Sequence, residues 1–304
     1  MRVLITGGAG FIGSHIVDRL LAAGHDVLIV DDLSTGKISN LDPRAELVQL
    51  DMGDTAFIEV AKEFAPDAIS HVAAQASVAV SMTDPVKDAN TNIIAGLNVY
   101  RAAIESGARQ FVYITTGGAL YGTPDYLPCD EQHPIRPMSG YGLSKWTLEQ
   151  YLKILLPPEV PLKVLRLANV YGPRQDPYGE AGVISIFAAR MIKQQSVHIF
   201  GDGEQTRDFV YVGDVARAHN LALQVPESLT VNVSSEEPLS VNSLFEMMAE
   251  ETGYPHEAIH QEERRGDIKH SVLANGRARA ALGWEPQTSM GDGLRATINW
   301  VREN

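Results

Sequence analysis

The fold follows from one glycine-rich stretch, Thr6-Gly7-Gly8-Ala9-Gly10-Phe11-Ile12-Gly13, near the start of the 304-residue chain. It joins an apolar, strand-like run (residues 3–6) to a helix-like stretch (residues 10–23). Glycines at such a turn permit a tight bend and close approach of a pyrophosphate, and the helix N-terminus stabilises the negative charge. The spacing is Gly-x-x-Gly-x-x-Gly instead of the usual Gly-x-Gly-x-x-Gly. This turn therefore predicts a dinucleotide-binding fold.

Strand-like and helix-like segments alternate through the first half of the chain. The apolar, β-branched runs are residues 3–6, 27–31, 46–50, 68–72, 111–115 and 162–167, and the helix-like stretches are 10–23, 55–64, 86–106 and 140–155. Such alternation predicts parallel strands joined by right-handed crossovers. Because the strands read as continuous apolar runs, helices are expected on both faces. We predict an α/β fold with a Rossmann-type doubly wound sheet.

The pattern changes after about residue 170. A loop rich in proline and glycine spans residues 173–182. Helix-like stretches follow at 183–194, 215–224, 241–251 and 290–302, with short strand-like pieces at 197–200, 209–212 and 230–233. We therefore predict a Rossmann domain over residues 1–173 and a smaller C-terminal α/β lobe over 174–304. Some later segments are expected to return to the main sheet.

Asp31 ends the second strand-like run, near the offset of about 20 residues at which an acidic residue accepts hydrogen bonds from an adenosine ribose. A carboxylate there would repel a 2′-phosphate. The position favours NAD over NADP.

Tyr141 and Lys145 form the second informative pattern, Tyr-x-x-x-Lys. Residues spaced i and i+4 share one face of a helix. A nearby ammonium favours the charged form of a tyrosine, whose ordinary pKa is about 10. We expect Lys145 to lower the pKa of Tyr141 and make a phenolate accessible near neutral pH. A phenolate beside a nicotinamide can support oxidation of an alcohol.

Over almost its whole length, the sequence resembles the extended short-chain dehydrogenase/reductases, and within them the UDP-glucose (UDP-galactose) 4-epimerases. The similarity rests on residues 6–13, 31–34, 51–52, 71–75, 115–122, 141–145, 166–174, 200–208 with Asp214, and 264–267. The resemblance implies an NAD site formed by Gly7, Gly10, Phe11, Ile12, Gly13, Asp31, Asp32, Leu33, Ser34, Thr35, Gly36, Asp51, Met52, Ala73, Ala74, Gln75, Thr115, Tyr141 and Lys145. Asp51 and Met52 would flank the adenine, and Lys145 would contact the nicotinamide ribose.

The family's third catalytic hydroxyl is a serine after the fifth strand, and this chain departs from that pattern. Aligning on Tyr121-Gly122 puts Gly117 at the serine position, whereas aligning on the strand puts Thr116 there. We favour Thr116 as the third catalytic residue, since glycine has no hydroxyl. Tyr141 acting without a third hydroxyl is the alternative. Related 4,6-dehydratases carry acidic residues where this chain has Gly117 and Gly118, so dehydration is not expected.

The resemblance also implies a UDP-sugar site in the C-terminal lobe. Its residues would be Asn169, Val183, Val197, Phe200, Arg207, Arg264 and Asp267. Arginine guanidinium groups suit diphosphate oxygens, and Arg207 and Arg264 are assigned that role. Ser271 corresponds to a bulky tyrosine in relatives restricted to non-acetylated sugars. Its small side chain leads us to expect room for an N-acetyl group.

Composition bounds the other possibilities. A formal net charge of −13 argues against sequence-independent nucleic-acid binding, which needs a basic surface. There is no apolar stretch long enough for a membrane span and no basic-then-apolar leader. The single cysteine, Cys129, fits a reducing compartment and has no metal-ligand cluster around it. We expect a cytoplasmic homodimer without a metal.

Taken together, the residues predict an NAD-dependent isomerase of galactose metabolism. It would interconvert UDP-galactose and UDP-glucose through a 4-keto intermediate and also accept N-acetylated UDP-hexoses. One alternative is an epimerase of another sugar nucleotide, such as UDP-glucuronate. A second, of another class, is a non-catalytic NAD-binding sensor or scaffold.

Overall fold

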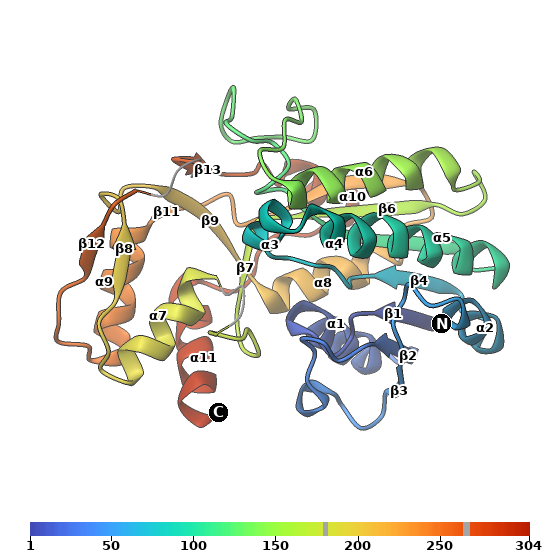
Figure 1. Cartoon of the computed structure of the whole chain (residues 1–304), viewed down its shortest axis with the longest axis horizontal. Helices are drawn as coiled ribbons and strands as arrows, with labels where there is room; N and C mark the ends of the chain where they lie inside the picture. Colours follow the sequence, from blue (N-terminus) through green and yellow to red (C-terminus); the bar gives the residue numbers. More distant parts are fainter. Residues whose placement is uncertain (179–181, 264–267) are drawn as a thin grey trace.

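A seven-stranded parallel sheet forms the centre of the protein in the computed structural model, which describes residues 1–178, 182–263 and 268–304 (Figure 1). Its strand order is β10-β6-β5-β4-β1-β2-β3. The strands are β1 (Arg2–Thr6), β2 (Asp26–Asp31), β3 (Glu46–Gln49), β4 (Ala68–His71), β5 (Gln110–Thr116), β6 (Leu162–Leu167) and β10 (Leu229–Val233). The chain builds outward from β1 in both directions, so the predicted Rossmann-type doubly wound fold is confirmed.

Helices cover both faces of this sheet because strand side chains alternate between two apolar layers. On one face Val3 and Ile5 pack with the helices α1 (Phe11–Ala22) and α8 (Val212–Ala222). On the other face Leu4 packs with α2 (Ala56–Phe64), α5 (Ala95–Glu105) and α6 (Gly140–Leu155). The sheet is therefore buried on both sides.

The segment after β4 differs from the single helix predicted over residues 86–106. The structure has α3 (Val78–Thr83), α4 (Pro85–Ala89), a π-helical turn η2 (Asn90–Ile94) and then α5. Asp84 caps α4 by accepting the Lys87 N–H at 3.0 Å, and Pro85 follows at the first helical position. Two buried polar side chains, Asp88 and Asn92, lie in and beside the irregular turn. The apolar periodicity predicts a helix here but not its π-helical interruption.

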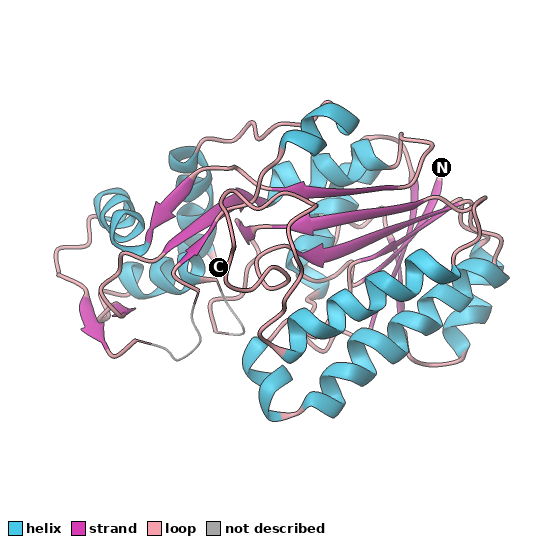
Figure 2. Cartoon of the chain, turned by 90° about the horizontal axis from the view of Figure 1, so that it is seen from above, coloured by secondary structure: helices cyan, strands magenta, loops and turns pink. Residues whose placement is uncertain are grey.

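A smaller lobe is formed by the C-terminal part of the chain (Figure 2). One sheet pairs β7 (Asn169–Tyr171), β9 (Thr206–Tyr211), β11 (Pro238–Ser240) and β13 (His270–Ser271), and a second pairs β8 (His198–Phe200) with β12 (Ile259–Gln261). The helices α7 (Val183–Ile192), α9 (Val241–Thr252) and α11 (Met290–Glu303) pack in the core of this lobe. By contrast, α10 (Gly276–Leu282) packs against the central sheet, and η1 (Ile38–Asn40) lies between β2 and β3. β10 lies between lobe segments in sequence but pairs with β6 in the central sheet.

The carboxyl ends of the central strands face the C-terminal lobe, as the arrowheads in Figure 2 show. In register, Thr6 of β1 lies beside Val30 of β2 and His71 of β4. Ligands of open α/β sheets bind at this edge, where the strand order reverses direction. The fold therefore brings the glycine-rich turn, the end of β2 and the start of α6 to one end of the sheet.

Candidate active site

Two glycines of the turn between β1 and α1, Gly7 and Gly13, lie tightly against backbone atoms. Gly7 has a φ of +72°, and a Cβ there would lie 2.7 Å from the backbone of Ala73. A Cβ on Gly13 would lie 2.0 Å from the Gly7 carbonyl oxygen. These two glycines let α1 pack close to the strand ends.

Gly10 serves a different purpose. A Cβ there would meet only the Gly7 oxygen, at 3.3 Å, so the space beside this glycine is otherwise free of described atoms. The first N–H groups of a helix have no intrahelical acceptor, and in α1 these belong to Phe11, Ile12 and Gly13. The turn thus forms a cradle that a side chain at residue 10 would fill. It fits a pyrophosphate.

Asp31 is held next to this cradle. Its carboxylate is buried and accepts the Ala9 N–H at 2.9 Å with Oδ2 and the Leu33 N–H at 2.9 Å with Oδ1. An ionised carboxylate has about four acceptor sites, so further hydrogen bonds from ribose hydroxyls remain possible. Gly36 packs over it, since a Cβ there would lie 2.8 Å from Oδ1.

The other predicted cofactor residues lie along the same edge. Asp32 and Thr35 are exposed in the loop after β2, and Ser34 donates to Asp32 from its N–H and its hydroxyl. Asp51 follows β3 and is exposed, whereas Met52 is buried. These residues follow the carboxyl ends of β2 and β3, which lie in order beside β1, and their contacts to NAD stay a prediction.

Ala73, Ala74 and Gln75 continue from β4. The Ala73 N–H donates to the Thr6 carbonyl at 3.1 Å. The Gln75 side chain is already engaged within the protein, because its amide donates to the Ser77 carbonyl and to Asp88 Oδ1 at 2.9 and 2.8 Å. Its position supports a role in shaping this wall of the site.

Tyr141 and Lys145 lie on the first two turns of α6, which begins after the capping residue Ser139. Lys145 is only 2% exposed. Burial lowers the pKa of Lys145 to about 7, although Asp88 opposes this shift. Burial, and then the charge of Asp88, raise the pKa of Tyr141 to about 12. The expected lowering of the Tyr141 pKa is therefore wrong for the protein alone, because burial and the charge of Asp88 both raise it.

Asn92 is a site residue that the sequence motifs did not identify. Its amide nitrogen donates to the Gln75 carbonyl at 2.9 Å, to Asp88 Oδ1 at 3.0 Å and to Ser144 Oγ at 3.1 Å. It therefore links the end of β4, α4 and the Tyr141 helix. The available signal is a pair of polar residues, Asp88 and Asn92, spaced i and i+4 at the start of the helix-like stretch over residues 86–106.

Leu273 occupies the space beside Gly117, in the threonine-glycine segment at the end of β5. A Cβ on Gly117 would lie 2.3 Å from Leu273 Cδ1, so a side chain there would displace Leu273. Thr116 is partly exposed, and its hydroxyl accepts the Ala119 N–H at 3.1 Å. The Thr115 hydroxyl is buried and has no hydrogen-bond partner among the described residues. These positions are compatible with Thr116 as the third hydroxyl, which remains a prediction.

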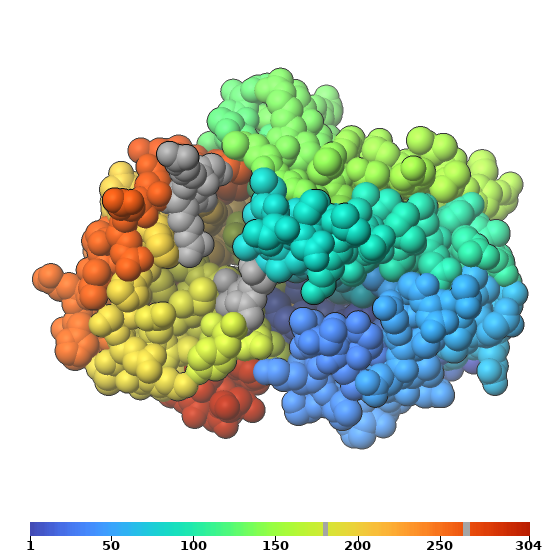
Figure 3. All heavy atoms as spheres, viewed as in Figure 1, coloured from blue at the N-terminus to red at the C-terminus, as the bar shows by residue number. Residues whose placement is uncertain are grey.

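A cavity of about 280 Å³ lies where the lobe meets α3. Asn169 and Val183, two of the predicted substrate residues, line it together with Ala76, Val78 and Phe209. In Figure 3 the molecular surface is hollowed where the N-terminal segments, in blue and cyan, face the yellow part of the lobe. This cavity offers a site for a ligand beside the carboxyl ends of the strands.

The remaining predicted substrate residues are more dispersed. Arg207 lies on β9 opposite Ser271 of β13 and donates to the Thr206 carbonyl at 2.8 Å. Phe200 ends β8 and is partly buried. Val197 is fully buried in the core of the lobe. Arg264 and Asp267 lie outside the described residues.

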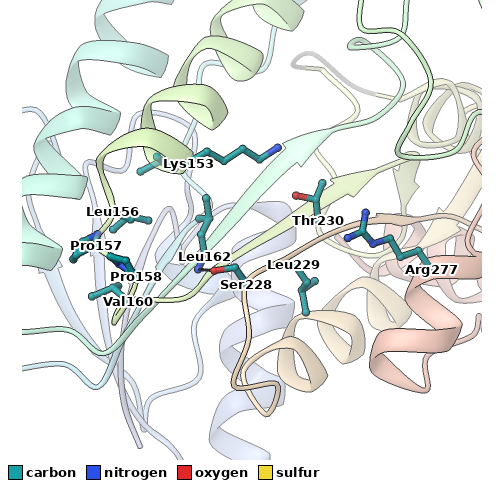
Figure 4. A pocket seen from close by; sticks show the side chains of 11 residues that line it. Lys153, Leu156, Pro157, Pro158, Val160, Leu162, Ser228, Leu229, Thr230 and Arg277 are labelled. Carbon is teal, nitrogen blue, oxygen red and sulfur yellow. Dashed lines mark hydrogen bonds between the residues drawn. The ribbon is translucent and has the colours of Figure 1, made fainter.

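A second cavity, of about 360 Å³, lies at the opposite end of the sheet (Figure 4). Its lining includes Leu162 and Leu229, the first residues of β6 and β10. Lys153 and Arg277 extend toward Thr230 in this view. Because these are the amino ends of the strands, this cavity is separate from the candidate active site.

Residues 1–178, 182–263 and 268–304 contain no group of three or more histidine, cysteine or acidic side chains that could hold a metal. Across the same ranges, we found no helix with the length and apolar character that a bilayer crossing requires.

Comparison with known proteins agrees with this geometry. Residues 3–234 match the NAD dependent epimerase/dehydratase family. The chain is 40% identical to UDP-glucose 4-epimerase of Mycolicibacterium smegmatis, with 99% of each chain covered. It is 43% identical to UDP-glucose 4-epimerase of Thermotoga maritima, solved with UDP-glucose, at a TM-score of 0.97 over 100% and 99% of the two chains.

A third relative handles an acetylated sugar. The UDP-N-acetylglucosamine 4-epimerase of Methanobrevibacter ruminantium, solved with UDP-N-acetylmuramic acid, is 32% identical at a TM-score of 0.94, over 99% and 98% of the two chains. The glycine cradle, the buried Asp31 and the Tyr141–Lys145 pair thus occur in a chain with full-length likeness to these enzymes. This protein belongs to the NAD dependent epimerase/dehydratase family.

Proposed function

We propose that this protein is an NAD-dependent epimerase that interconverts UDP-galactose and UDP-glucose. The observation that carries the proposal is the Tyr141–Lys145 pair on α6, at the same end of the sheet as the glycine cradle. Gly117 and Gly118 supply no acid for dehydration, which favours oxidation and re-reduction at one carbon. The names of the full-length relatives support the same reaction.

In this mechanism Tyr141, as a phenolate, takes the proton from the sugar hydroxyl at carbon 4. It returns that proton after the 4-keto sugar has presented its other face. Protonated Lys145 stabilises the phenolate, and Thr116 offers a hydroxyl to the same sugar oxygen. A raised Tyr141 pKa in the protein alone means that the phenolate depends on positive charge contributed by Lys145 and by the occupied cofactor site.

The residues that would hold NAD are those of the cradle and its surroundings. Gly10 and the N-terminus of α1 would hold the pyrophosphate, Asp31 a ribose, and Lys145 the nicotinamide ribose. When bound, NAD supplies a positively charged ring and reversible acceptance of a hydride from the sugar.

We place NAD binding in residues 1–173 and UDP-sugar binding mainly in residues 174–304. Asn169 and Val183 face the cavity beside the strand ends, and Arg207 would contact the diphosphate. The small Ser271, opposite Arg207, leads us to include N-acetylated UDP-hexoses among the substrates. Ser271→Tyr should lower turnover of the acetylated sugars selectively, measured with UDP-glucose and UDP-N-acetylglucosamine in parallel.

The reaction is tested by incubating the purified protein with a panel of UDP-sugars and separating the products. Tyr141→Phe should reduce interconversion by about 10²- to 10⁴-fold because general acid–base catalysis is lost. Tyr126→Phe, which changes an exposed tyrosine in the loop before α6, is the matched control and should remain active. Turnover of UDP-glucuronate alone would favour that substrate, and NAD-loaded protein without any sugar turnover would favour a sensor or scaffold.

We also propose a homodimer. An apolar surface, formed by Val86, Ile94, Leu143, Tyr151, Ile154 and Leu155, is exposed on α4, η2 and α6. Figures 1 and 2 show α5 and α6 side by side on one outer face. Ile154 is the most exposed of these six side chains, at 78%, and exposed apolar patches mark protein–protein interaction sites.

Sedimentation measurements test the dimer. Ile154→Glu should shift the protein toward monomer, whereas Ile38→Glu changes an equally apolar residue that is 65% exposed elsewhere on the surface. A monomeric wild-type protein would refute the proposal.

The single reduced and buried Cys129 is consistent with the cytoplasmic location that we propose for the enzyme.

A further inference from the structure

A buried aromatic ring lies directly against the candidate catalytic lysine. Lys145 Nζ is 4.5 Å from the centroid of the Tyr113 ring, and Lys145 and Tyr113 are 2% and 0% exposed. A cation above an aromatic face is attracted by the negative face of the ring, and the attraction increases when both groups are desolvated. Tyr113 was not part of any motif in the sequence.

The charges around Lys145 make this contact important. Asp88 of α4 acts on Lys145 from a distance, but its Oδ1 accepts hydrogen bonds from Gln75 and Asn92. Glu149, one turn further along α6, is committed to a bidentate pair with Arg166, at 2.6 and 3.2 Å. The described residues place no carboxylate in an ion pair with Lys145, and the Tyr113 ring of β5 lies against its ammonium.

The Tyr113 ring is itself fixed by its surroundings. Its hydroxyl donates to the Lys145 carbonyl at 3.2 Å, and its ring stacks on His71 with a centroid distance of 5.6 Å and an angle of 19°. His71 Nδ1 is 2.8 Å from the Thr6 hydroxyl at the end of β1. Burial lowers the pKa of His71 to about 3, so this side chain is neutral and does not compete as a cation near Lys145.

We propose that Tyr113 is a positioning residue. The face of its ring keeps Lys145 in the ammonium form, on the helix that also carries Tyr141. This inference deepens the proposed function and rests on it. Lys145 must carry its charge to stabilise the Tyr141 phenolate. Loss of the ring should therefore shift the pH at which Lys145 loses its proton, and with it the alkaline limb of turnover.

Two substitutions separate the ring from its hydroxyl. Tyr113→Phe keeps the ring face and should retain the wild-type pH profile of kcat. Tyr113→Leu removes the ring, and the alkaline limb of kcat should move down by about one pH unit, a roughly tenfold change in the acid dissociation constant. KM for the UDP-sugar should change little, since Tyr113 does not line the sugar cavity.

A second measurement does not depend on activity. In protein labelled with ¹⁵N-lysine, the Nζ titration of Lys145, assigned with Lys145→Met, should show the same downward shift in Tyr113→Leu. If Tyr113→Leu does not fold, pentafluorophenylalanine at residue 113, compared with Tyr113→Phe, keeps the shape of the ring and reverses the charge of its face. It should then lower the midpoint of the Lys145 titration.

Three outcomes would overturn the inference. One is a Lys145 titration that is unchanged when the ring is removed or fluorinated. Another is an equal shift in Tyr113→Phe, which would assign the effect to the hydroxyl. The third is a uniform fall in kcat at every pH together with a lower melting temperature, which is the signature of a structural role. Absence of UDP-sugar turnover in the wild type would instead refute the proposed function, and the titration would still test Tyr113.

Discussion

Alanine at Gly13 should mainly lower stability, whereas alanine at Gly10 should mainly weaken cofactor binding. The two glycines are three residues apart in the same turn, yet their surroundings differ. A Cβ at residue 13 would lie 2.0 Å from the Gly7 carbonyl oxygen and 2.8 Å from its carbon, both backbone atoms that cannot rotate away. A Cβ at residue 10 would meet one oxygen at 3.3 Å, and the backbone there is extended, with a φ of −76°.

The magnitudes follow from these contacts. Gly13→Ala gains up to about 1 kcal/mol of helix propensity, but the overlap forces a backbone shift, and overpacking of this kind typically costs about 1–3 kcal/mol or more. We expect a net loss of about 2 kcal/mol, or roughly 4 °C in Tm. Gly10→Ala should lose less than about 1 kcal/mol, mainly from a poorer N-cap. Its methyl group would instead occupy the space that a pyrophosphate needs.

The assay compares Tm with and without NAD, and the NAD content of the purified proteins. Saturation at about 100 times Kd stabilises a protein by about 2.7 kcal/mol, so the wild type should show a clear rise in Tm. Gly10→Ala should have a near-wild-type Tm without NAD and little rise with it. A Gly10→Ala protein that retains the wild-type NAD content and rise in Tm would refute the assignment of the pyrophosphate to this cradle.

Two further predictions concern buried charges. Burial raises the pKa of Asp208 from 3.8 to about 6, despite hydrogen bonds from Ser235 and the Leu273 N–H. Between these two pH values, Asp208 is protonated in the folded protein and ionised in the unfolded chain. The contribution of Asp208 to the free energy of unfolding is therefore largest below pH 3.8 and falls by about 3 kcal/mol as pH rises through 6. Denaturant titrations at several pH values should show that loss in the wild type and not in Asp208→Asn. Glu149→Gln leaves the Arg166 guanidinium, 2% exposed, without its partner carboxylate, and urea unfolding should reveal a loss of about 3–5 kcal/mol. An unchanged unfolding midpoint would show that water or another group compensates Arg166.

Local sequence patterns predicted the parts of the site that lie within one strand-turn-helix unit. The glycine turn, Asp31 at the end of β2 and the Tyr141–Lys145 pair each depend on neighbours within a few residues, so spacing alone locates them. The alternation of strands and helices likewise predicted the doubly wound sheet. The limits of the long helix after β4 were less predictable, because the π-helical turn around Asn92 depends on contacts with Gln75 and Ser144.

What the sequence by itself determined is the fold class and the family, because these follow from residue type and short-range periodicity, and the same patterns predict which residues carry the chemistry. Only the tertiary structure decided which groups surround those residues. It buries Lys145 against Tyr113, raises the pKa of Tyr141 through desolvation, and fills the space beside Gly117 with Leu273, more than 150 residues away in the chain. Desolvation and packing depend on every element that closes around a side chain, and no local spacing reports them.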